Sequence, residues 1–345
     1  MSDGYELELT PRRMPLSRPF TISRGSIDIQ ESLLVGLRHR EHVGYGEATR
    51  HVYYGHSIES LTRSLEAIRP WLRSIATQEP EELWPQLQQK LSDDSFALSA
   101  IDSAAHDLAA KIAGTNCFER WGSRWCDVPL SSVTIPIDSP ERIAQEAREY
   151  AGWPIIKIKL GGPDDLEAVR AVRNATDAII RVDANCGWDP KQAVELSAEL
   201  AKLGVEFIEQ PLPANAGFEA DRFVYQHSKL PVIADESCVR EADVGLCQSR
   251  FHGVNIKLSK CGGLTPAVRM ARAAREVGLS TMVGCMIESS VGVASAAQLL
   301  PLIDYADLDG HVLLSDDPTT GFSLKLGLVT LEHPGGHSAA PRFAA

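Results

Sequence analysis

The chain has 345 residues, of which 44% are hydrophobic and 23% are charged, and its formal net charge is −12 at pH 7. This acidic balance argues against nucleic acid or an anionic membrane surface as the main partner, and no apolar run is long enough to span a bilayer. The first residues lack the apolar core of a secretory signal and the seven cysteines form no CxxC pair, so we expect a cytoplasmic protein without structural zinc.

The N-terminal part, residues 1–125, is predicted to be a small α+β domain, because runs of strands are followed by runs of helices. Alternating apolar and polar residues indicate an antiparallel meander at 5–10, 31–40 and 45–48, with a turn at 41–44. Helical patterns follow at 58–75, about 81–91 and 94–113.

Residues 126–315 are predicted to form a (β/α)₈ barrel, because short runs rich in Val and Ile alternate with helical patterns. The eight predicted strands are 132–137, 155–160, 179–184, 205–210, 231–236, 253–258, 280–285 and 303–308. Asp189 and Thr265, each followed by a proline, are predicted helix N-caps. A doubly wound open sheet is the structural alternative, but no glycine-rich nucleotide-binding fingerprint follows a strand.

The C-terminal segment, residues 316–345, follows the eighth predicted strand. We expect it to pack back on the N-terminal domain, with little structure in its last ten residues.

Three acids lie at the predicted C-terminal ends of successive strands: Asp183, Glu209 and Asp235, each 26 residues from the next. Reactive groups of barrels come from these strand ends, and three converging carboxylates repel one another without a cation. Hard oxygen ligands favour Mg²⁺. One acid at a strand end is often only a helix cap, but three in register favour a metal site.

Three lysines lie at the C-terminal ends of predicted barrel strands. Lys157 and Lys159 share one face of the run IIKIKL, and Lys257 ends the sixth strand, opposite the second. Neighbouring cations lower the pKa of a lysine, so a neutral lysine can remove a proton next to a metal-bound carboxylate while the opposite lysine returns one. This arrangement predicts a 1,1-proton transfer; a structural network of ion pairs under the acids is the alternative.

Neighbouring residues have supporting roles in this interpretation. We expect Glu236 to face away from Asp235 by strand alternation, and Asn185 to support the site by hydrogen bonding. Lys260 is expected in a loop and is the weaker lysine candidate.

The motifs together resemble the enolase superfamily, muconate-lactonising subgroup, and within it the dipeptide epimerases. The matching motifs are KIK at 157–159, DAN at 183–185, EQP at 209–211, ADES at 234–237, NIKLSKCGG at 255–263, GCMIESS at 284–290 and DLDG at 307–310. The resemblance covers essentially the whole chain and implies a modified (β/α)₈ TIM barrel with an N-terminal α+β capping domain that the C-terminal segment completes.

The resemblance also implies roles for individual residues. Asp183, Glu209 and Asp235 would bind Mg²⁺, Lys159 and Lys257 would be the catalytic acid/base pair, and Lys157 would hold the substrate carboxylate or tune Lys159. The implied reaction inverts the α-carbon of the C-terminal residue of a dipeptide through a metal-stabilised enediolate, a pattern known for enolase-type sites. Homo-oligomerisation is left open.

The feature that separates dipeptide epimerases from their relatives is DLDG. Asp307 and Asp309 are two residues apart, so both can face one side and bind a cation, which by resemblance is the dipeptide ammonium. The alternative is a pair of solvated caps.

Two loops of the capping domain, 17–29 and 48–56, are expected by resemblance to cover the barrel mouth. Arg24 is a candidate for binding a carboxylate of the substrate, and Thr134 and Ile287 are candidates for lining the site. The alternative is that His51, Tyr53 and Tyr54 form an aromatic pocket for the substrate.

Other reactions fit the same scaffold. N-succinylamino acid racemase, o-succinylbenzoate synthase and muconate cycloisomerase keep the metal and lysines but need no acidic pair on the eighth strand. A Schiff-base aldolase and a non-catalytic binding protein are more distant alternatives.

Overall fold

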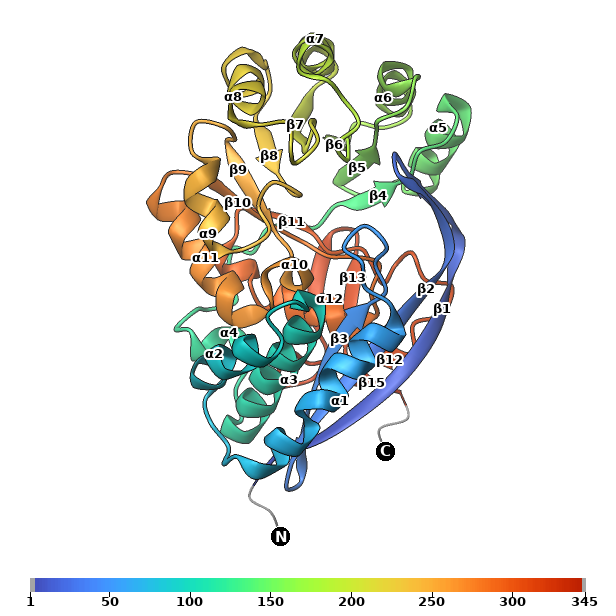
Figure 1. Cartoon of the computed structure of the whole chain (residues 1–345). Helices are drawn as coiled ribbons and strands as arrows, with labels where there is room; N and C mark the ends of the chain where they lie inside the picture. Colours follow the sequence, from blue (N-terminus) through green and yellow to red (C-terminus); the bar gives the residue numbers. More distant parts are fainter. Residues whose placement is uncertain (1–3, 343–345) are drawn as a thin grey trace.

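The N-terminal cap is built on an antiparallel sheet in the computed structural model, which describes residues 4–342. Its three strands are β1 (Glu6–Ile22), β2 (Gly25–His39) and β3 (His42–Thr49), with β2 in the centre. Alternation along β2 separates two cores: Leu33 and Val35 pack against the cap helices, whereas Leu34 joins the barrel core. The sheet therefore joins the two parts of the molecule (Figure 1).

The β1–β2 hairpin is longer than expected. Phe20 pairs with Ile27, and the strands continue to a tight turn at Ser23 and Arg24. Residues 17–29 are thus mostly paired strand, and the expectation of a loop there is wrong, because cross-strand pairing and not local composition decides the conformation. The backbone N of Ile137 donates to the Thr21 carbonyl at 2.9 Å, which ties the hairpin to the barrel.

Four helices complete the N-terminal part: α1 (Ile58–Ser74), α2 (Pro80–Lys90), α3 (Ser95–Ala113) and α4 (Cys117–Arg120). The first three lie within two residues of their predicted positions. Asp94 caps α3 by accepting from the backbone N of Ala97 at 3.0 Å, and Gly114 ends the helix at φ 67°. The helix is buried on most of its surface because it lies between the cap sheet and the barrel (Figure 1).

Eight parallel strands form the barrel, in the order of the sequence. They are β4 (Val133–Ile135), β5 (Ile155–Lys159), β6 (Ile179–Asp183), β7 (Val205–Glu209), β8 (Val232–Ala234), β9 (Gly253–Ile256), β10 (Ser280–Gly284) and β11 (Tyr305–Asp307). The first and last strands meet, because Ser131 bridges Ala306 and the backbone N of Ser132 donates to the Ala306 carbonyl at 3.2 Å. The barrel prediction is confirmed, and the open-sheet alternative is wrong.

Helices and short turns connect the strands: α5 (Pro140–Glu149), α6 (Asp165–Arg173), α7 (Pro190–Lys202), α8 (Phe218–His227), α9 (Glu241–Val244), η1 (Gly245–Cys247), α10 (Leu258–Cys261), α11 (Leu264–Glu276), α12 (Ser290–Ala297) and η2 (Leu300–Leu302). Asp189 caps α7 as predicted. Thr265 does not cap α11, which begins one residue earlier; the Thr265 hydroxyl donates instead to Asp102 of α3 at 2.8 Å. Lys260 lies in α10 and not in a loop.

The C-terminal segment returns to the cap through short strands: β12 (Thr319–Thr320), β13 (Phe322–Lys325), β14 (Leu328–Leu331) and β15 (Ala340–Pro341). His337 is buried, its backbone N donates to Asp107 Oδ1 at 2.8 Å and its Nε2 lies 2.7 Å from the Tyr45 carbonyl. The expectation of little structure in the last ten residues is therefore wrong up to residue 342; residues 343–345 lie outside the described residues.

Between residues 4 and 342, no helix combines the length and the apolar character that crossing a membrane requires.

Candidate active site

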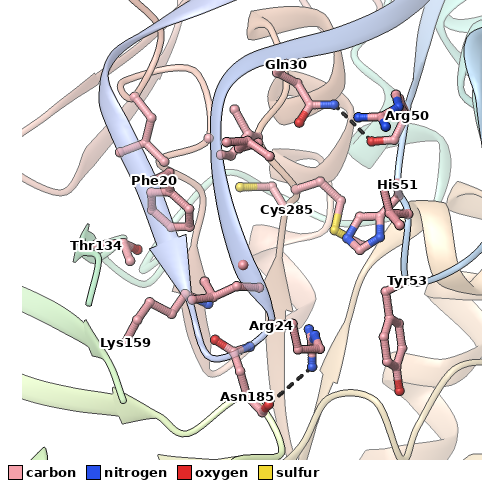
Figure 2. A pocket seen from close by; sticks show the side chains of 18 of the residues that line it. Phe20, Arg24, Gln30, Arg50, His51, Tyr53, Thr134, Lys159, Asn185 and Cys285 are labelled. Carbon is pink, nitrogen blue, oxygen red and sulfur yellow. Dashed lines mark hydrogen bonds between the residues drawn. The ribbon is translucent and has the colours of Figure 1, made fainter. Parts of the chain in front are cut away.

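A pocket of about 520 Å³ opens at the C-terminal ends of the barrel strands, beneath the β1–β2 hairpin. Figure 2 shows side chains from both parts of the molecule around it: Phe20, Arg24, His51 and Tyr53 from the cap, and Lys159 from the barrel. The pocket is thus placed where barrel enzymes carry their reactive groups.

The three predicted acids form one cluster. Asp183 ends β6, Glu209 ends β7 in register with it, and Asp235 follows β8. Each offers a carboxylate oxygen, and these oxygens lie within 4.8 Å of one another. All three side chains are buried, so their mutual repulsion is little screened by water. The cluster therefore requires compensating positive charge.

One oxygen of each acid is held by a hydrogen-bond donor outside the cluster. These bonds fix the carboxylate planes and leave the second oxygens to face a common space. They run from the Asn185 backbone N to Asp183 Oδ1 at 2.9 Å, from Asn255 Nδ2 to Glu209 Oε1 at 2.7 Å, and from Lys260 Nζ to Asp235 Oδ1 at 2.6 Å.

The second oxygens all meet lysine ammonium groups. Such oxygens are hard donors already arranged around positive charge, so the cluster fits a divalent cation of the magnesium type. The contacts are Lys157 Nζ to Asp183 Oδ2 at 3.1 Å and to Glu209 Oε2 at 2.6 Å, Lys159 Nζ to Asp183 Oδ2 at 2.6 Å, and Lys257 Nζ to Asp235 Oδ2 at 2.8 Å.

The charged groups of the cluster shift one another's pKa values. Burial lowers the pKa of Lys257, but the carboxylates of Asp235 and Glu209 outweigh it and raise that pKa above its usual range. Burial, reinforced by the charge of Asp183, raises the pKa of Glu209 to about 7. Lys257 is therefore an ammonium ion while it is bonded to Asp235, and a cation that shared this carboxylate would lower the pKa of Lys257 again.

Asp307 and Asp309 enter the pocket from the end of β11. Asp307 Oδ2 accepts from Lys157 Nζ at 2.8 Å, and Asp309 Oδ2 accepts from the backbone N of Thr134 at 2.6 Å. Burial, together with the charge of Asp307, raises the pKa of Asp309 to about 7. Two buried carboxylates and one lysine partner leave this side of the pocket suited to a further cation. Their interpretation as solvated caps is inconsistent with their exposures of 6% and 4%.

Arg24 is paired inside the protein. Its Nη1 lies 2.6 Å from Glu236 Oε1 and 3.2 Å from the Asn185 carbonyl, and its guanidinium lies 4.4 Å from the centre of the Tyr53 ring (Figure 2). Glu236 lines the same pocket as Asp235, so the expectation that it faces away is wrong. The reason is that β8 ends at Ala234, before the alternation reaches these residues.

Thr134 and Ile287 both line the pocket. Two buried polar residues next to the acids, Gln210 and Asn255, were not predicted as site residues. Asn255 carried a usable signal, because it is two residues from Lys257 and therefore shares its face of the strand. Gln210 directly follows Glu209, and nothing in a single sequence shows where its side chain turns.

Family comparisons cover most of the chain. Residues 5–120 match the family described as mandelate racemase / muconate lactonizing enzyme, N-terminal domain. Residues 141–341 match the family described as enolase C-terminal domain-like.

Individual proteins match over nearly the full length. An L-Ala-D/L-amino acid epimerase of Flavobacterium johnsoniae is 44% identical over 331 residues, 96% of this chain and 98% of that protein. An L-Ala-D/L-Glu epimerase of Bacteroides thetaiotaomicron is 35% identical over 332 residues, covering 95% and 86%. Among solved structures, a dipeptide epimerase from Cytophaga hutchinsonii, complexed with Mg and the dipeptide D-Ala-L-Val, superposes with a TM-score of 0.93 at 27% identity, covering 99% and 97%.

Proposed function

The chain belongs to the mandelate racemase / muconate lactonizing enzyme family of the enolase superfamily, and from this premise we propose that it is a Mg²⁺-dependent dipeptide epimerase. The proposed reaction inverts the α-carbon of the C-terminal residue. The observation that carries the proposal is that one pocket holds two lysines on opposite strands and a buried acidic pair beside them. Inversion by two bases requires a lysine on each side of the substrate, and binding of a free ammonium group requires the acidic pair.

Mg²⁺ would be held by Asp183, Glu209 and Asp235, through the oxygens that converge in the structure. The bound ion would neutralise the charge that develops on the substrate carboxylate as the α-proton leaves, and would compete with the lysines for the same carboxylates. Lys157 is fully buried between the acids and Asp307, and we propose that it holds the substrate carboxylate or tunes Lys159.

Lys159 and Lys257 are the proposed proton carriers. Lys159 ends β5 and Lys257 directly follows β9, the second and sixth strands of an eight-stranded barrel, so they would approach a substrate α-carbon from opposite faces. In each turnover the neutral lysine takes the α-proton and the other, as an ammonium, delivers one to the opposite face. The configuration inverts, which leaves the first lysine as an ammonium and the second neutral. This form acts on the opposite stereoisomer, and proton exchange with water restores the starting form.

Asp307 and Asp309 are proposed to bind the substrate ammonium. This group sits at the opposite end of a dipeptide from the carboxylate, and the acidic pair at the end of β11 is bonded to Lys157 of β5 and to the backbone of Thr134 of β4. The pair disfavours the rival substrates, because a succinylated or cyclic acid brings a carboxylate or an apolar ring to buried negative charge. An N-succinylamino acid racemase is therefore the second candidate and not the first.

A pooled library of L,L-dipeptides incubated with the enzyme and Mg²⁺ in D₂O tests this proposal. We expect some dipeptides to gain one mass unit of deuterium, as measured by mass spectrometry. N-succinylamino acids are run in parallel, and exchange restricted to them would replace the proposal with the second candidate.

A further inference from the structure

Gln210 lies between two acids of the metal cluster. It follows Glu209 at the end of β7, is fully buried, and has a φ of 34°, in the left-handed region that residues other than glycine rarely adopt. Its backbone N donates to the Ile233 carbonyl of β8 at 2.9 Å. A residue held in this conformation at a functional site generally has a positional role.

The side-chain amide of Gln210 is fully used. Its Oε1 accepts from the backbone N of Asp235 at 2.9 Å and of Ser237 at 3.0 Å. Its Nε2 donates to the Leu212 carbonyl at 2.7 Å and to Ser237 Oγ at 2.9 Å. Both hydrogens and both acceptor sites of the amide are thus occupied, which fixes its orientation.

The turn that bonds the Gln210 amide, residues 235–237, carries two acids of the pocket. Asp235 is a proposed Mg²⁺ ligand, and Glu236 binds Arg24 at the tip of the cap hairpin. Because β8 ends at Ala234, strand pairing no longer positions these residues. Beyond this point the turn is held by hydrogen bonds to the Gln210 amide at the end of β7, in place of hydrogen bonds between paired strands.

We propose that Gln210 is a positioning residue that holds the turn at Asp235–Ser237 and thereby sets the affinity of the acidic cluster for Mg²⁺. The inference rests on the proposed function only for the identity of the ion. Partners of this kind behind metal ligands typically change affinity about 10- to 100-fold when they are removed.

The test is calorimetric titration of MgCl₂ into the substrate-free enzyme, which does not depend on activity. Gln210→Met removes all four side-chain hydrogen bonds at similar volume, and we expect its Kd for Mg²⁺ to rise about 10- to 100-fold. Gln210→Glu keeps an acceptor for the two backbone N–H groups, so we expect its Kd to lie closer to that of the wild type. Gln210→Asn is one methylene too short to reach the turn and tests the same point should the Met variant fail to fold.

Gln298→Met is the matched control. Gln298 is also a fully buried glutamine, but its side-chain amide forms hydrogen bonds with the backbone of Ala294 and Phe118, outside the metal cluster. We expect this variant to lose thermal stability while keeping the wild-type Kd.

The proposal is overturned if Gln210→Met or Gln210→Asn binds Mg²⁺ within twofold of the wild type, since the residue would then be only structural. It is also overturned if the wild type binds no Mg²⁺. Wild-type Mg²⁺ binding and a weakened variant, without deuterium exchange in any dipeptide, would support the positioning role and refute only the proposed function.

Discussion

Lys159 and Lys257 stand four strands apart in a barrel of eight, and each is bonded to a different acid of one cluster. Lys159 Nζ lies 2.6 Å from Asp183 Oδ2, and Lys257 Nζ lies 2.8 Å from Asp235 Oδ2. Because both lysines border the space where the acids converge, a substrate whose carboxylate bound there would have one proposed proton carrier on each side of its α-carbon. This relationship is the arrangement that the proposed inversion with two bases requires.

The first prediction concerns these two lysines. Lys159→Met and Lys257→Met should each lower the epimerisation rate by about 10²- to 10⁴-fold, because each removes one proton carrier. Each variant should still exchange the α-proton of one stereoisomer for deuterium with retention, and the two variants should exchange opposite stereoisomers. Proton NMR in D₂O measures this, with Lys202→Met, an exposed lysine on α7, as the control. Exchange of both stereoisomers by both variants would contradict the assignment.

Substrate binding should depend on pH through Asp309. Its pKa is raised to about 7 by burial and by the charge of Asp307, so the carboxyl is protonated below that pH and ionised above it. Only the ionised form attracts an ammonium, and affinity should therefore fall as the pH falls through about 7. A dipeptide with a C-terminal 2-aminoisobutyrate residue has no α-proton to lose, so its Ki reports binding alone. Asp309→Asn should bind it more weakly and without this pH dependence; a variant with the wild-type profile would disprove the role of Asp309.

Blocking the substrate ammonium should weaken turnover. An N-acetyl dipeptide cannot form charged hydrogen bonds with Asp307 and Asp309, and a hydrogen bond to a charged group contributes about 1.5–3 kcal/mol. We expect kcat/KM to fall about 10- to 150-fold relative to the free dipeptide. Equal kcat/KM values for the two substrates would remove the reason for preferring a dipeptide over an acylated amino acid.

Magnesium should stabilise the fold through the acidic cluster. A ligand present at 100 times its Kd adds about 2.7 kcal/mol to the free energy of unfolding. We expect a higher thermal midpoint with Mg²⁺ for the wild type and no rise for Asp235→Asn, which lacks one ligand oxygen. Glu195→Gln, an exposed acid on α7, should respond like the wild type. An unchanged Mg²⁺ response of Asp235→Asn would exclude Asp235 as a ligand.

The barrel and its charged centre could be predicted because they depend on local patterns. Runs rich in Val and Ile marked most of the eight strands, and acids at strand ends converge in any closed barrel. The helix cap at Asp189 could be predicted for the same reason, since its hydrogen-bond partners are two and three residues away in the sequence.

The errors came from pairings and contacts that the local sequence pattern does not show. The hairpin at 17–29 depends on cross-strand pairing, and Thr265 is bonded to Asp102, 163 residues away. His337 is ordered by Asp107, 230 residues away in the sequence. Gln210 depends on a backbone conformation that composition does not show. Each of these features is fixed by the cap meeting the barrel or by one strand end meeting the next.

The most direct test of the central claim is the position and stereochemistry of deuterium in a single responding L,L-dipeptide. The enzyme, Mg²⁺ and the dipeptide are incubated in D₂O, and the product is hydrolysed and analysed by chiral chromatography with mass spectrometry. We predict deuterium only at the α-carbon of the C-terminal residue, appearing with the D-configuration at that residue. Deuterium at the N-terminal α-carbon, or exchange by the wild type without inversion, would contradict the two-lysine account.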